Sequence, residues 1–144
     1  MAPEERAALA TWISPAQLEL FDSMHVADRR HGLDVLASLR AERVSERDAL
    51  LAGLLHDAGK GDTGVWPRVA YALAGNYGQW IATVARRLPG FGAPIERLRT
   101  HASTSAELAA AAGCPPRTVE LIRWQDAPID PEFGELLKLA DEAN

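Results

Sequence analysis

The sequence has 144 residues, a net charge of -5 and one cysteine, with 47% apolar and 24% charged residues. The length suits one domain whose core folds without disulfides, and the acidic balance argues against general nucleic-acid binding. The lone Cys114 and an acidic N-terminal stretch argue against secretion, and no apolar run reaches the roughly 18 residues of a membrane span. We expect one soluble, cytoplasmic domain over residues 1–144, and the sequence does not predict its oligomeric state.

Residues 14–42 predict two helices. Residues 14–17 combine an N-cap serine, a proline at the first helical position and a glutamine at the capping-box position. The helix that they open carries Leu18, Phe21 and Met24 at helical spacing. A second helix is expected over about 26–42.

The next helix is predicted to be the central one. Residues 45–48 match the [ST]-x-x-[DE] pattern of a helix start. Residues 49–55 are apolar on every face, which is typical of a helix buried on all sides. Gly59 and Gly61 are expected to end it.

The rest of the chain predicts further helices separated by loops. Loops are expected over 60–65 and 89–94, and Asp130-Pro131 is typical of a helix start. No segment alternates as a strand does, so the sequence predicts an all-α fold: a single compact helical domain with about 6–8 helices and no sheet. The expected helices cover about 67–74, 78–87, Ile95 or His101 to Ala112, Pro116 to Gln125 and Pro131 to Ala143.

A His56-Asp57 doublet follows the buried helix. An ionised aspartate in an apolar setting costs several kcal/mol unless it is paired or bound to a metal. A cation bound by both side chains would remove that cost. The competing interpretation is a water-exposed Asp57 with His56 as a hydrogen-bonded core histidine, and for an isolated doublet this plainer interpretation is preferred.

Residues elsewhere in the sequence favour the interpretation of a metal site. His31, His101 and Asp141 each share a helix face with apolar residues, which directs them inward. Several such groups from different helices indicate convergence on an ion. Imidazoles with carboxylates suit Mn, Fe, Co, Ni or Zn more than Ca, with Mg as a further candidate. His25 lies among polar neighbours and is not included.

The stretch from Lys60 to His101 is basic in an otherwise acidic protein. It holds six bases and two acids, a local charge of +4. This suits a small anionic, phosphate-containing substrate, although a solvated helix face would give the same pattern. Arg97, Arg99 and Arg123 are candidates for a bidentate phosphate clamp.

The order His31, His56-Asp57, Asp141 resembles the HD-domain metal-dependent phosphohydrolases, which are named for that doublet. Residues 54–60, LLHDAGK, fit the family signature LLHDxGK. Residues 28–33 look like its first-histidine helix and residues 139–141 like its closing helix. The resemblance covers roughly residues 17–144.

The resemblance implies a function and a ligand set. The activity would be hydrolysis of a phosphate ester, such as a nucleotide, by a metal-activated water. Asp57 would lie beside that water and Lys60 close to the substrate phosphate. A solvated Lys60 at a helix C-terminus is the alternative. The implied metal ligands are His31, His56, Asp57 and Asp141.

His101 raises the question of whether the site holds one ion or two. Residues 101–109 are similar to a helix of two-metal members of the family, in which this histidine binds the second ion. Trp124 and Gln125 stand where those members carry histidines. We therefore expect one ion, with His101 at a weak second ion or at the substrate phosphate. The alternative functions are a metal-binding signalling module that binds a nucleotide or phosphate without turnover, and a helical scaffold without metal.

Overall fold

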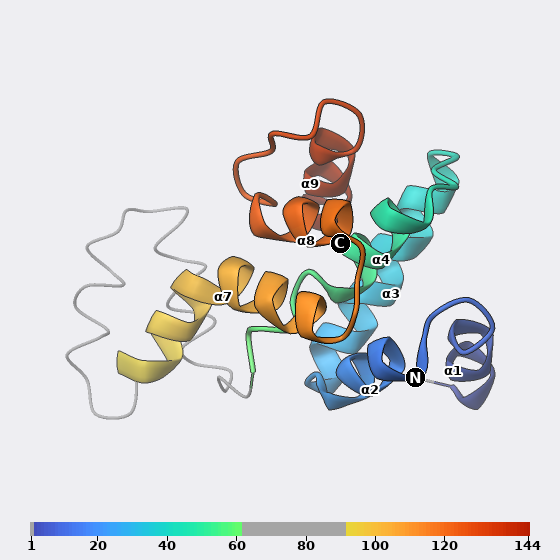
Figure 1. The fold of residues 1–144 in the computed structure, drawn as a ribbon, viewed down its shortest axis with the longest axis horizontal. Coiled ribbons are helices and arrows are strands. Elements are labelled where there is room, and N and C mark those ends of the chain that lie inside the picture. Colours follow the sequence, from blue (N-terminus) through green and yellow to red (C-terminus); the bar gives the residue numbers. More distant parts are fainter. Residues whose placement is uncertain (1, 62–91) are drawn as a thin grey trace.

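The computed structural model describes residues 2–61 and 92–144, and side chains for 2–61 and 100–144. This part of the chain is helical and contains no strand, so the predicted all-α class is confirmed. None of its helices has both the length and the apolar composition that a membrane span requires. The helices (Figure 1) are α1 Pro3–Leu9, α2 Pro15–Ser23, α3 Val26–Ala41, α4 Arg47–Leu55, α7 Gly92–Ala111, α8 Pro116–Arg123 and α9 Gly134–Glu142.

Helix α4 is the centre of the fold, as its composition predicts. Residues 49–55 are all buried, and α4 packs against α2, α3, α8 and α9 (Figure 1). Gly32 lets α3 approach closely, because a Cβ there would lie 2.5 Å from the Leu54 carbonyl oxygen. Helices α3 and α9 are therefore held against one buried, apolar helix.

One predicted helix start is confirmed and another is wrong. The Ser14 hydroxyl accepts from the Gln17 N–H at 3.2 Å, and the Gln17 amide oxygen accepts from the Ser14 N–H at 3.0 Å. Ser45 does not cap α4: the N-cap is Glu46, whose carboxylate accepts from the Ser45 N–H. A tertiary contact holds this end instead, because the Thr118 hydroxyl donates to the Asp48 carbonyl.

Two other predicted starts shift. Helix α7 begins at Gly92, inside the expected loop 89–94. Pro94 is compatible with this start, since it falls in the first turn, where its missing N–H needs no acceptor. Helix α9 begins at Gly134 rather than Pro131, since the Asp130 carboxylate accepts from two N–H groups and holds the preceding residues in a turn. The helices expected over 67–74 and 78–87 lie outside the described residues, as does most of the loop 60–65.

Candidate metal centre

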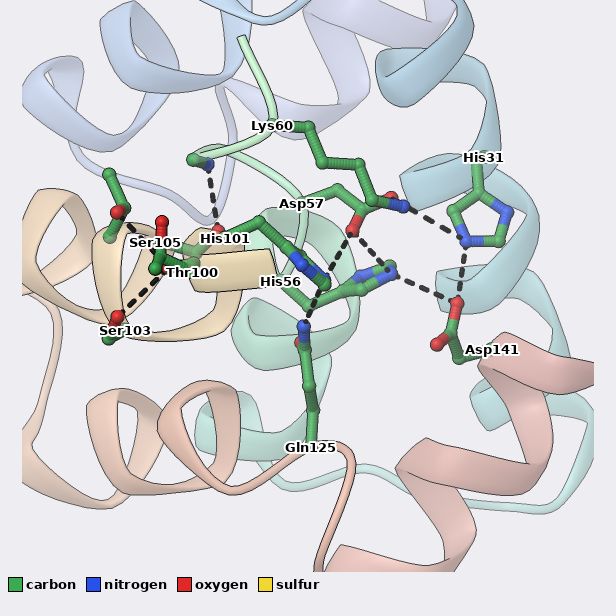
Figure 2. A network of polar contacts seen from close by, with 12 residues as sticks. His31, His56, Asp57, Lys60, Thr100, His101, Ser103, Ser105, Gln125 and Asp141 are labelled. Carbon is green, nitrogen blue, oxygen red and sulfur yellow. Dashed lines mark hydrogen bonds and ion pairs between the residues drawn. The ribbon is translucent and has the colours of Figure 1, made fainter. Parts of the chain in front are cut away.

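Three helices bring together three side chains that could hold a metal ion (Figure 2). His31 lies on α3, His56 directly follows α4, and Asp141 lies on α9. The Asp141 Oδ1 atom is 2.7 Å from His31 Nε2 and 3.2 Å from His56 Nε2. All three ligand atoms lie within 4.8 Å of one another, so this cluster could hold a metal ion.

The backbone fixes the orientation of the His56 ring. His56 Nδ1 is 2.9 Å from the Gly53 carbonyl oxygen, which can only accept, so Nδ1 carries a proton. The Nε2 atom consequently points at the carboxylates of Asp57 and Asp141, at 3.5 Å and 3.2 Å. A ring N–H that donates to a carbonyl while the other nitrogen faces the site is the usual arrangement of a metal-binding histidine.

The charges of the cluster depend on each other. Burial disfavours a charged His56, but Asp57 and Asp141 outweigh it and raise the pKa of His56. Burial also disfavours a charged Asp141, but hydrogen bonds from His31 and His56 hold the pKa of Asp141 far below its usual range. The carboxylates of this cluster are therefore ionised, and they stabilise a positively charged group that lies between them, such as a protonated imidazole or a cation.

Asp57 is buried beside the cluster. It is 1% exposed, which excludes the interpretation of a water-exposed aspartate. Its Oδ2 lies 3.9 Å from His31 Nε2, and its buried Oδ1 accepts no hydrogen bond within the described part of the chain. Burial acts to raise the pKa of Asp57, but the charges of His56 and Lys60 outweigh burial, so the pKa is lowered from its ordinary value. An ionised carboxylate thus presents an unused acceptor at the centre.

Lys60 pairs with Asp57 rather than extending into solvent. Its ammonium group donates to Asp57 Oδ2 at 2.5 Å, and its side chain is 23% exposed. The turn from Asp57 to Lys60 brings the two side chains together, because the Lys60 N–H donates to the Asp57 carbonyl. A partly exposed cation therefore lies beside the cluster.

His101 and Gln125 form the other side of the centre (Figure 2). His101 Nε2 lies 3.7 Å from Asp57 Oδ1. The Gln125 amide N–H donates to the same His101 Nε2 atom at 2.9 Å. Gln125 is 3% exposed and its Oε1 has no hydrogen-bond partner among the described residues. The sequence marks Gln125 only as a departure from a family pattern, whereas the structure makes it a direct neighbour of His101. Trp124 is 45% exposed and does not belong to the core.

The remaining predicted residues lie elsewhere. The side chains of Arg97 and Arg99 fall outside the described residues. Arg123 is exposed at the end of α8 and lines a cavity with Trp124 that contains no residue of the cluster. The structure therefore does not bring Arg123 into the metal cluster.

Gly59 determines how closely α7 approaches the doublet. A Cβ there would lie 2.6 Å from the His101 carbonyl oxygen and the Ser105 backbone nitrogen, and the Gly59 N–H donates to the Ser105 hydroxyl. We expect Gly59→Ala to lower the free energy of unfolding by about 1–3 kcal/mol, as overpacking does, and to move His101 away from Asp57. Chemical denaturation measures this loss.

The matched control for Gly59→Ala is Gly113→Asn. Gly113 has φ +73 and nothing within 4 Å of a Cβ placed there. Asparagine tolerates this backbone conformation, so the control should cost less than Gly59→Ala. Equal losses for the two variants would mean that the contact between Gly59 and α7 is not tight.

Comparison of the chain with protein-family models, with curated proteins and with solved structures finds no match. The geometry of the centre and the sequence pattern are therefore what point to a function.

Proposed function

We propose that the chain is a cytoplasmic metal-dependent phosphohydrolase of the HD-domain type that acts on a small phosphate ester. The observation that carries the proposal is the convergence of His31 Nε2, His56 Nε2 and Asp141 Oδ1 from three helices. The sequence pattern supports it, because the residues in this cluster are those that the resemblance to HD-domain enzymes implies as ligands.

The donor set fits a divalent transition metal. Two imidazoles and a carboxylate suit Mn, Fe, Co, Ni or Zn, and Asp57 lies close enough to be a fourth ligand. His31 and the Asp141 side chain are partly exposed while His56 is buried, so the cluster is accessible from the side of α3 and α9. A divalent ion bound there would lower the pKa of a coordinated water and polarise a phosphoryl oxygen.

Three side chains would contribute directly to hydrolysis. Asp57 Oδ1, a buried acceptor, would orient the attacking water by accepting a hydrogen bond from it. Lys60 would neutralise a phosphate oxygen with the ammonium group that it now directs at Asp57. His101, whose Nε2 lies 3.7 Å from Asp57 Oδ1, would help to position the phosphate.

One observation favours a second candidate, a metal-binding module that binds a nucleotide or phosphate without turnover. The Gln125 amide occupies His101 Nε2, the atom that would otherwise bind a second ion. Amide side chains are weak ligands for transition metals, so a second ion would not be held tightly there. This candidate predicts that the metal-loaded protein binds a phosphate or nucleotide and leaves that molecule chemically unchanged.

The proposal is tested by metal analysis of the purified protein and by turnover of phosphomonoesters and nucleotides with each candidate metal. We expect about one bound divalent ion per chain and release of phosphate, both lost in His56→Ala and Asp57→Ala. The matched control is Asp34→Ala, since Asp34 lies on α3 outside the cluster and pairs with Arg30 at the surface.

Two results would contradict the proposal. Metal content that is unchanged in His56→Ala would disprove the site. Metal-loaded protein that binds phosphate but turns over no ester with any metal would establish the second candidate instead.

A further inference from the structure

Gln125 is a buried amide whose side chain forms one hydrogen bond within the described part of the chain, to His101. Figure 2 shows the His101 ring between this amide and Asp57. Gln125 is 3% exposed, and its Oε1 accepts no hydrogen bond from the described residues. A buried amide with an unpaired oxygen adds little to stability, because its desolvation is only partly compensated. Stability of the fold therefore does not explain a glutamine at this position.

The hydrogen bond fixes which nitrogen of His101 carries the proton. The amide nitrogen of Gln125 donates and cannot accept, so His101 Nε2, at 2.9 Å, is the acceptor. A neutral imidazole whose Nε2 accepts carries its proton on Nδ1. Gln125 thus keeps hydrogen off the ring nitrogen that lies beside Asp57.

The position of that proton decides whether Asp57 stays available. His101 Nε2 lies 3.7 Å from Asp57 Oδ1, which is beyond hydrogen-bond distance, and Oδ1 is a buried acceptor without a donor among the described residues. A proton on Nε2 would draw the ring and the carboxylate together, because a charge-assisted hydrogen bond is about twice as strong as a neutral one. Asp57 Oδ1 would then be occupied by His101 and lost to the attacking water.

We propose that Gln125 is a positioning residue that holds His101 in the tautomer protonated on Nδ1 and thereby keeps Asp57 Oδ1 free to accept a hydrogen bond from the attacking water. This inference rests on the proposed function, since it concerns the same reaction. Gln125 acts through His101 and not on the water itself. A leucine in its place would lack the donor, and a glutamate would accept a hydrogen bond and move the proton to Nε2.

The test is Gln125→Leu, which removes the donor and keeps a side chain of similar size. Proton–nitrogen correlation spectra of metal-free protein with isotope-labelled histidine report the tautomer, and His101→Phe assigns the His101 signals. We expect a proton on Nδ1 in the wild-type protein and on Nε2 in Gln125→Leu. In the metal-loaded protein, kcat should fall about 10-fold or more while KM changes less than about twofold, because the lost interaction orients the water in the transition state.

Thr118→Val is the matched control. Thr118 is buried on α8, and its hydroxyl donates to the Asp48 carbonyl. Its loss should lower the free energy of unfolding but leave the His101 tautomer and kcat unchanged. In the His101→Phe background, Gln125→Leu should change kcat less than about twofold, because its effect depends on His101. If Gln125→Leu does not fold, Gln125→Met, which keeps the unbranched shape, takes its place.

Four results would overturn the inference: a wild-type His101 protonated on Nε2, a variant that keeps the wild-type tautomer, an unchanged kcat although the tautomer has moved, or an equal loss of kcat in the His101→Phe background. Wild-type protein that turns over no ester contradicts the proposed hydrolase instead. The tautomer spectra then decide alone whether Gln125 keeps the proton off Nε2, because they need neither metal nor substrate.

Discussion

Asp141→Asn should abolish tight metal binding while leaving the helical fold in place. Asp141 Oδ1 is the atom shared by both imidazoles, at 2.7 Å from His31 and 3.2 Å from His56. Loss of a partner outside the ligand set of a metal already costs about 10–100-fold in affinity, so loss of a direct carboxylate ligand should exceed about 100-fold. Calorimetric titration with Mn²⁺ or Zn²⁺ measures the change.

The fold should survive because asparagine is nearly the same size as aspartate. Its amide oxygen could still accept from a histidine N–H, and α9 stays anchored by Leu137 and Ala140, which are buried. Glu142→Gln is the matched control, since Glu142 is the exposed neighbour on the same helix. Unchanged affinity in Asp141→Asn, or an equal loss in the control, would remove Asp141 from the ligand set.

The second large effect is an opposite pH dependence of stability with and without metal. The pKa of His56 is raised in the folded protein above its ordinary value of 6.5, because Asp57 and Asp141 outweigh burial. A raised pKa contributes stability that is fully present below about pH 6.5 and is lost as the pH rises through the folded value. The metal-free protein should therefore become less stable as the pH is raised above 6.5.

The carboxylates of Asp57 and Asp141 affect stability at the acid end of the pH range. The pKa values of Asp57 and Asp141 are lowered from 3.8, so their contribution is present above about pH 4 and is lost only in stronger acid. The metal-free protein should consequently be most stable between about pH 4 and pH 6.5. Metal binding needs a deprotonated His56 Nε2, so the stabilisation by excess metal should grow as the pH rises.

Thermal unfolding from about pH 4 to pH 9, with a chelator and with excess Mn²⁺, checks both trends. His56→Ala is expected to remove the loss above pH 6.5 and most of the stabilisation by metal. His25→Ala, which changes an exposed histidine, should keep both. A metal-free protein whose stability rises between about pH 6.5 and pH 8 would contradict the charge arrangement of the cluster.

The fold was predictable where one segment carries its own signal. The composition of residues 49–55 is enough to identify a buried central helix, and residues 14–17 specify their own cap. Helix α1 was not predicted, because only Leu9 of it is buried and it shows no apolar periodicity. Surface ion pairs connect it to α2 and α3, between Arg6 and Asp22 and between Glu5 and Arg30. Such partners are not apparent from the local sequence.

The candidate site was predictable in its ligands but not in its neighbours. Helical spacing directed His31 and Asp141 inward, and the structure places both against His56. Gln125 was missed as a contact because its position beside His101 depends on how α7 packs on α8.

Anomalous diffraction at the absorption edge of the bound metal tests the central claim most directly. We expect one peak bonded to His31 Nε2, His56 Nε2 and Asp141, at the roughly 2.0–2.2 Å typical of imidazole and carboxylate ligands. A crystal of metal-loaded protein with no peak among these three side chains, or with its metal bound elsewhere, would contradict it.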